Sequence, residues 1–369
     1  MEKREFLKKI IMGGITLTVL PVMGKLTSCS SKMKSIFDET KLNNLKLKNR
    51  LIRSATWESL AEANGGLNDE IIDIYDELAR GGIAAIITGL TDVVPENALA
   101  RTMGLWNDDV IPDFQRLTTT VRKHDCKILT QIVMGNYRRG YGEGKSKVLE
   151  ADDLTADDIQ NIIQLFTDAA VRAEKSGFDG VQIHSAYSFY LRRFISADYN
   201  HRIDDYGGSP KKRVRLLVDI LNSIREKCPG LHITIKISYD EDSAEDILVA
   251  CRELSAHGID SIEITGNNTS KKDIRTVKDE AYFLDYAASL QETISTPVIL
   301  VGGHRSMWNM SKVLSESPIE YFSLSRPLIR EPNLPNKWKN GYKEPAACIS
   351  CNACYRTPGR RCIYNIKRE

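Results

Sequence analysis

The sequence lacks the features that would place it among membrane-spanning, repeat or nucleic-acid-binding proteins. No apolar segment is long enough to span a bilayer, and no short repeat of the solenoid kind is present. The formal net charge of +2 conceals an acidic body, because residues 35–334 carry 36 Lys and Arg against 45 Asp and Glu. Since such a body repels phosphates, we expect no nucleic acid as a partner.

The basic N-terminus is typical of an export signal. Residues 1–29 begin with four Lys and Arg, continue with an apolar stretch over 10–24, and end at Cys29. Leu26-Thr27-Ser28-Cys29 resembles a bacterial lipobox, and residues 3–8 resemble the twin-arginine export motif with Lys in place of the first Arg. An amphipathic N-terminal helix is the alternative. We expect an exported, membrane-anchored lipoprotein of the bacterial cell envelope, held by lipidated Cys29, with residues 30–37 as a tether.

From residue 48 onward, short apolar runs alternate with amphipathic helical patterns, as in parallel βα units. The predicted strands are Leu51–Ala55, Ala84–Thr88, Ile128–Val133, Gly180–His184, His232–Ile237, Ser261–Thr265, Val298–Val301 and Tyr321–Leu324. The clearest helix is predicted over 155–176, with Thr155 and Asp158 as a capping box and Gly177 after its end.

Two α/β folds accommodate this alternation. A doubly wound sheet would need a Gly-rich dinucleotide turn after the first strand, and residues 54–57 (Ser-Ala-Thr-Trp) offer none. We therefore predict an α/β protein with a (β/α)8 TIM barrel, whose function resides where its strands end.

Four segments at these positions carry a family resemblance. They are residues 47–56 (LKNRLIRSAT), 177–184 (GFDGVQIH), 200–209 (NHRIDDYGGS) and 325–332 (SRPLIREP). In this order and spacing they resemble the Old Yellow Enzyme family of NADH:flavin oxidoreductases, over roughly residues 38–340. The resemblance implies FMN at the barrel mouth, a small-molecule substrate, and NAD(P)H or a redox partner protein as electron donor.

The predicted FMN-binding residues follow from strand ends and from the resemblance. Gly302 and Gly303 expose backbone N–H groups, and Ser325 and Arg326 add a hydroxyl and a guanidinium, so together they suit a phosphate. Gly302-Gly303 alone would be interpreted as a plain turn. Gln131 can bond the pyrimidine edge of the flavin, and Lys236 stands where the family often carries Arg near flavin N1; a barrel-mouth ion pair is its alternative role. Positions lining the flavin in the family correspond to Ser54, Ala55, Thr56 and Gly89.

The predicted catalytic residues depart from the family pattern. Relatives have His-x-x-His or His-x-x-Asn after the fourth strand, with a proton-donating Tyr five residues past the first His. Here His184 is kept, Tyr187 takes the second position, and Phe189 replaces the proton donor. We predict His184 and Tyr187 as substrate ligands and Tyr137 as a candidate proton donor; a buried structural His184 is the alternative.

Four cysteines crowd the C-terminal end, in residues 341–369. Cys348, Cys351, Cys354 and Cys362 have no His among them, and thiolates so spaced are typical of iron–sulfur or zinc sites. Two disulfides are the alternative in an exported protein. Members of the same superfamily carry a [4Fe–4S] cluster on a similar run, so the resemblance favours that cluster over zinc.

Three functions remain open from the sequence. The first is an FMN oxidoreductase that reduces an activated C=C bond or a similar acceptor. The second is an FMN/iron–sulfur dehydrogenase that oxidises a small substrate such as an amine. The third is a catalytically quiet, flavin-binding surface lipoprotein.

Overall fold

The computed structural model describes residues 34–95, 99–140, 147–240, 243–266 and 270–366. The predicted export signal with Cys29 lies outside these residues, as do residues 30–33 of the predicted tether. Within the described part of the chain, no helix is both long and apolar enough to cross a membrane.

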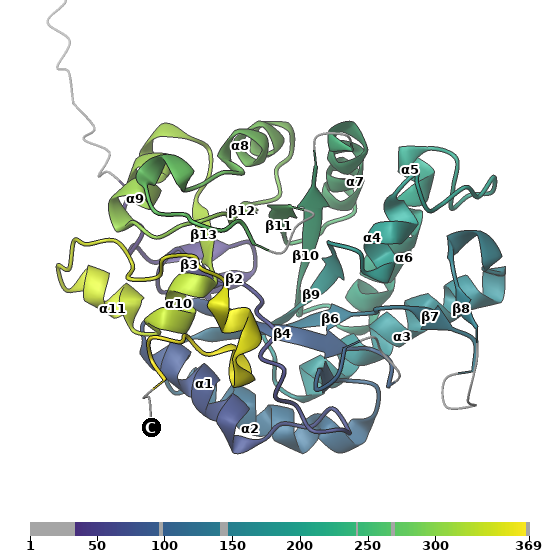
Figure 1. The fold of residues 1–369 in the computed structure, drawn as a ribbon. Helices are drawn as coiled ribbons and strands as arrows, with labels where there is room; N and C mark the ends of the chain where they lie inside the picture. The colour runs from purple at the N-terminus through teal and green to yellow at the C-terminus, as the bar shows by residue number, and fades with distance from the viewer. Residues whose placement is uncertain (1–33, 96–98, 141–146, 241–242, 267–269, 367–369) are drawn as a thin grey trace, which may run out of the picture. The chain divides into compact units, whose positions relative to one another are not determined.

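Eight parallel strands close into a barrel (Figure 1). They are β3 (Leu51–Arg53), β4 (Ala85–Asp92), β6 (Lys127–Val133), β9 (Gly180–Ser185), β10 (His232–Tyr239), β11 (Ser261–Gly266), β12 (Val298–Leu300) and β13 (Tyr321–Leu324). Each pairs in parallel with its neighbours, and the pairing of β3 with both β4 and β13 closes the ring. The predicted TIM barrel is therefore confirmed. Every residue of β4 and β11 is buried, as strands covered on both faces require.

Helices surround the barrel on its outer side. They are α1 (Asp69–Arg80), α2 (Ile111–Arg122), α3 (Ala156–Lys175), α4 (Tyr190–Ile195), α5 (Pro210–Arg213), α6 (Arg215–Lys227), α7 (Ala244–Ala256), α8 (Leu284–Thr293), α9 (Met307–Glu316), α10 (Arg326–Arg330) and α11 (Leu334–Lys339). α3 begins and ends as predicted: Thr155 and Asp158 form a capping box, and Gly177 follows with φ of +84°.

The amino-terminal end of the barrel is covered by a hairpin of β1 (Thr40–Leu42) and β2 (Leu45–Leu47). Its buried leucines at 42, 45 and 47 pack against Ile52, Ile299 and other residues at the start of the barrel strands. A second hairpin joins β7 (Tyr137–Arg138) to β8 (Val148–Leu149), and the short β5 (Met103–Gly104) extends the sheet beyond β4.

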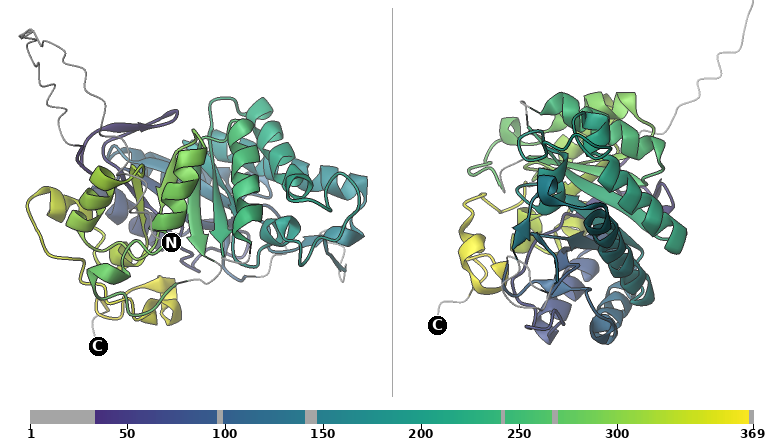
Figure 2. Two further views of the ribbon diagram at one scale, coloured as in Figure 1. Left: turned by 90° about the horizontal axis from the view of Figure 1, so that it is seen from above. Right: turned by 90° about the vertical axis from the view of Figure 1, so that its right-hand side faces the viewer.

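The C-terminal segment folds back against the opposite end of the barrel. Its two 3₁₀ turns, η4 (Ala353–Arg356) and η5 (Pro358–Arg360), lie beside α10 and α1 (Figures 1 and 2). Arg361 forms an ion pair with Glu70 of α1, with 3.0 Å between Nη2 and Oε1. The segment thus reaches the mouth of the barrel, where function resides in this fold.

Candidate active site at the barrel mouth

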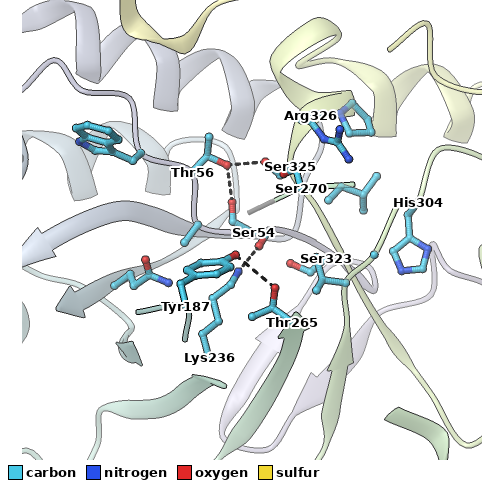
Figure 3. Close-up of a pocket in the computed structure, with 18 of the residues that line it drawn as sticks. Ser54, Thr56, Tyr187, Lys236, Thr265, Ser270, His304, Ser323, Ser325 and Arg326 are labelled. Carbon is cyan, nitrogen blue, oxygen red and sulfur yellow. Dashed lines mark hydrogen bonds between the residues drawn. The ribbon is translucent and has the colours of Figure 1, made fainter. Parts of the chain in front are cut away.

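A cavity of about 550 Å³ opens at the carboxyl ends of the barrel strands (Figure 3). Most of the predicted site residues line it: Ser54, Ala55, Thr56, Gln131, His184, Tyr187, Lys236, Gly302, Gly303, Ser325 and Arg326. They come from six different strands or the loops that follow them, so only the closed barrel brings them together.

Two predicted residues lie elsewhere. Gly89 packs behind the cavity wall, where a Cβ atom would come within 2.6 Å of the Thr56 carbonyl oxygen; only glycine allows this approach. Tyr137 belongs to the β7–β8 hairpin, and its buried hydroxyl donates to Asp158 at 3.1 Å. The hairpin directs Tyr137 toward α3, so the structure does not place it as a proton donor for a ligand in this cavity.

The glycine pair and Arg326 form one end of the cavity. Gly302 and Gly303 have φ of +124° and +74°, which other residues rarely adopt. Arg326 is buried, and its Nη1 donates to the Lys271 carbonyl oxygen at 2.8 Å and to Asn352 Oδ1 at 2.6 Å. The backbone conformation and the fixed guanidinium fit the predicted phosphate role.

A buried polar network forms the floor of the cavity. Lys236 Nζ donates to Ser54 Oγ at 2.8 Å and to Glu263 Oε1 at 3.2 Å. Glu263 also accepts from Ser54 Oγ at 2.6 Å and from Gln182 Nε2 at 2.8 Å, and Gln182 in turn accepts from Gln131 at 2.7 Å. Glu263 and Gln182 were not among the site residues predicted from the sequence. Each interrupts a run of β-branched apolar residues inside a strand, which is the signal that could have identified them.

His184 is held as a neutral hydrogen-bond donor. Burial, and then the charge of Lys236, lower the pKa of His184 to about 3. Its Nδ1 accepts a long hydrogen bond from the Ala186 N–H at 3.4 Å, which assigns the ring proton to Nε2. Phe189 packs edge-on against the ring, with 4.5 Å between ring centroids.

Tyr187 enters the cavity from a strained backbone. Its φ of +58° lies in the left-handed region, which is uncommon for a bulky residue and costs on the order of 1–3 kcal/mol. Ser238 Oγ accepts from the Tyr187 N–H at 2.8 Å, and the Tyr187 hydroxyl lies 3.3 Å from Thr265 Oγ1. The strain directs this phenol toward Lys236 and Ser54 (Figure 3).

The cavity wall also presents buried polar atoms that fit a ligand. Four residues of the cavity wall, Trp57, His304, Arg305 and Ser323, each have a buried side-chain nitrogen or oxygen without a hydrogen-bond partner among the described residues. Buried groups of this kind cost free energy unless they are satisfied. The glycine pair and Arg326, which line the cavity, suit a polar, phosphorylated cofactor.

The C-terminal cysteines lie next to this cavity, and Cys348 contributes to its lining. All four are free thiols. Burial first, and then the charges of neighbouring cysteines, raise the pKa of Cys348 and of Cys354. As the side chains stand, no group of three or more His, Cys, Asp or Glu in the described part of the chain is placed to hold a metal ion. The donor chemistry therefore suits a thiolate-bound metal, whereas the arrangement of the side chains does not form a site.

A (β/α)8 barrel with a glycine pair after its seventh strand and an arginine after its eighth is typical of a broad class of cofactor-binding enzymes. The comparison with known families is more specific, because residues 35–344 match the NADH:flavin oxidoreductase / NADH oxidase family. The chain belongs to this family, which confirms the resemblance and supports FMN as the cofactor.

Individual relatives are more distant. NADH oxidase of Thermoanaerobacter brockii is 28% identical over 345 residues, which cover 86% of this chain and 53% of that protein. Cinnamate reductase of Clostridium sporogenes is 26% identical over 368 residues, covering 86% of this chain and 55% of that protein. The solved structure of histamine dehydrogenase from Rhizobium sp. 4-9 has a TM-score of 0.78 at 22% identity, covering 89% and 51% of the two chains. This chain thus spans about half the length of these relatives, and the last likeness shows the fold alone.

Proposed function

We propose that the chain is an FMN-dependent oxidoreductase that reduces an activated C=C bond or a similar acceptor, with NAD(P)H as reductant. The observation that carries the proposal is the pairing of a neutral His184 with the Tyr187 phenol on one cavity. Two hydrogen-bond donors side by side suit a carbonyl or nitro oxygen that gains negative charge during reduction. The name of the similar cinnamate reductase agrees with this substrate class.

Each residue of the cavity has a role in this proposal. Gly302, Gly303, Ser325 and Arg326 would hold the phosphate of FMN, and Gln131 its pyrimidine edge. When bound, FMN supplies the hydride. His184 Nε2 and the Tyr187 hydroxyl would bind and polarise the substrate oxygen. Tyr137 lies outside the cavity, so Tyr187 is the phenol that stands near a bound substrate.

Oxygen-free turnover of a cyclic enone tests the proposal. We expect NADH or NADPH to be consumed in step with saturated product, and Tyr187→Phe to lower the rate by removing one donor while retaining the ring. Purified protein without flavin, or flavin that the enone does not reoxidise, would contradict the proposal.

A second candidate is an FMN/iron–sulfur dehydrogenase that passes electrons from a small substrate, such as an amine, to a redox partner. It is favoured by the four free cysteines of the C-terminal segment, of which Cys348 lines the cavity. Iron analysis of anaerobically purified protein separates the two candidates. A [4Fe–4S] cluster predicts about four irons per chain and turnover with a one-electron acceptor, whereas zinc or no metal favours the self-contained reductase.

We also propose that the protein is exported and anchored to a membrane of the cell envelope through lipidated Cys29. The lipobox-like run before Cys29 and the basic, apolar start of the chain support this proposal. Cys29→Ser should move the protein from the membrane fraction to the soluble fraction. Equal distribution of the variant and the wild type would contradict the anchor.

A further inference from the structure

Glu263 is a buried carboxylate in the middle of β11, directly below the cavity. Its side chain is 0% exposed, and that of its ion-pair partner Lys236 is 4% exposed. Three side chains donate to it, from Ser54, Gln182 and Lys236. These residues and Glu263 itself belong to four of the eight barrel strands or their ends, so contacts from across the barrel converge on this carboxylate.

The two charges of this pair depend on each other. Burial disfavours the ammonium of Lys236, but the attraction and hydrogen bond to Glu263, together with smaller contributions from Tyr187 and Tyr355, raise the pKa of Lys236 above its usual value. Burial likewise opposes ionisation of Glu263, but Lys236 and the hydrogen bonds from Ser54 and Gln182 hold its pKa below the usual value. Because an unpaired buried charge is costly, removing one partner changes the protonation of the other.

Lys236 lines the cavity. Glu263 does not, because Lys236 and Ser54 lie between it and the cavity. Two-electron reduction of FMN with uptake of one proton adds one negative charge to the ring system. A nearby cation favours this product, and a nearby anion disfavours it. We propose that Glu263 is a positioning residue that fixes Lys236 in its charged form and lowers the reduction potential of bound FMN by offsetting that charge. This inference rests on the proposed function, because it requires FMN above Lys236.

The test is the midpoint potential of FMN in the full-length, flavin-loaded protein, measured by equilibration with redox dyes from pH 6 to pH 9. Glu263→Gln removes the carboxylate charge and keeps the size of the side chain. At low pH, where Lys236 is charged without its partner, we expect reduction to become at least about tenfold more favourable, or about 30 mV for a two-electron couple.

The change in midpoint potential caused by Glu263→Gln should depend on pH, because it depends on the charge of Lys236. In the wild type, attraction to Glu263 keeps Lys236 charged throughout this range. In Glu263→Gln, burial acts without that attraction and lowers the pKa of Lys236. The gain in potential should therefore disappear as pH rises and Lys236 loses its proton.

Lys236→Met tests the same pair by removing its cation in place of its anion. This variant keeps the proposal testable if Glu263→Gln does not retain FMN. The unpaired Glu263 should have a raised pKa because of its burial. As pH rises and Glu263 ionises, the potential should fall below that of the wild type.

Asp260→Asn is the matched control. Asp260 is also a buried carboxylate on the β11 side of the barrel, but it pairs with Arg225 at the amino-terminal end, with 2.6 Å between Oδ2 and Nη2. We expect it to leave the potential and its pH dependence unchanged. Flavin-loaded Glu263→Gln and Lys236→Met with wild-type potentials would overturn this inference alone, whereas a wild type without FMN would overturn the proposed function as well.

Discussion

His184 can act as a hydrogen-bond donor across the neutral pH range, because burial and the charge of Lys236 keep its ring in the neutral form there. Its pKa of about 3 means that the ring is neutral above pH 4, with the proton assigned to Nε2 by the contact from Ala186. We expect His184→Ala to lower kcat/KM for an enone by about 10²–10³-fold, the usual loss for one such donor. The pH profile of the wild type should show no inflection near 6.5, the ordinary pKa of histidine.

His232 is the matched control for this variant. It is also fully buried on a barrel strand, and burial lowers its pKa to about 4. It lies at the opposite end of the barrel, however, where it bonds Asn44 at 2.6 Å and Ser261 at 2.9 Å. His232→Gln should therefore preserve kcat/KM. Equal losses in the two variants would mean that His184 acts through the fold and not on the substrate.

Single residues were predictable where position along a strand determines their surroundings. Gln131, Lys236 and Arg326 were found in this way, because strand ends meet at one mouth, whereas Ser54 came from the family resemblance. Tyr137 was placed by closeness in sequence to Gln131, but the β7–β8 hairpin turns it toward Asp158. Glu263 was missed because its importance arises from partners on other strands, which its own neighbours in sequence do not reveal.

At the scale of elements, the start of α3 combines a helix cap within the local sequence with contacts to the β7–β8 region. Asp158 accepts from the Thr155 N–H at 2.8 Å and from the Thr155 hydroxyl at 2.7 Å, and it also binds Arg139 and Tyr137 of the β7–β8 region. The hydrogen bond from Arg139, together with those from Thr155, holds the pKa of Asp158 well below its usual value despite the opposing effect of burial. One carboxylate thus caps the helix and fixes the hairpin.

Thr155→Ala should lower the free energy of unfolding by about 1 kcal/mol at pH 7, as is usual for a lost N-cap. Asp158→Asn should cost more, because it also releases Arg139 and Tyr137. Since a lowered carboxyl pKa stabilises the fold above the unfolded pKa near 4, the deficit of Asp158→Asn should shrink as pH falls from 5 to 3.

Urea unfolding at pH 7, 5 and 3 measures both effects, with Thr155→Ser as the control that keeps the hydroxyl. A deficit of Asp158→Asn that does not change with pH would show that the ionised carboxylate is not what stabilises this region.

The elements themselves were largely predictable. All eight barrel strands were located, because each is an apolar run between turn signals, and β13 has the predicted bounds. The main differences are at the carboxyl ends, where β4 extends to Asp92 and β10 to Tyr239. Polar residues such as Asp92 do not indicate a strand by themselves. Such residues still continue a strand where the neighbouring strand offers backbone hydrogen-bond partners. In β4, for example, Thr91 and Asp92 pair with Ile132 and Val133 of β6.

At the scale of the whole molecule, the sequence predicted a barrel and a separate cysteine-rich C-terminal segment, whereas in the structure both parts line the same cavity. Ser350, Tyr355 and Arg360 line the cavity, and the Arg360 guanidinium lies 4.6 Å from the ring centre of Trp57. Tyr355 and Ser270 share a hydrogen bond between the tail and the loop after β11. Contacts over such long separations leave no local pattern, so the sequence could predict the cysteines but not that their segment forms part of the wall.

This arrangement predicts that cofactor affinity depends on a residue of the tail. Asn352 accepts from Arg326 Nη1 at 2.6 Å and donates to the Ser270 carbonyl oxygen at 3.1 Å, so it holds the proposed phosphate ligand in place. A hydrogen bond to a charged group contributes about 1.5–3 kcal/mol to the free energy of folding. If half of this is lost to FMN binding, Asn352→Ala should weaken the binding of FMN by about three- to tenfold. Asn365→Ala is the control, since Asn365 bonds Arg330 at 3.0 Å and does not line the cavity.

Equilibrium dialysis against FMN measures the affinity of both variants. If Asn352→Ala bound FMN as tightly as Asn365→Ala, the tail would cover the cavity without positioning Arg326 for the cofactor.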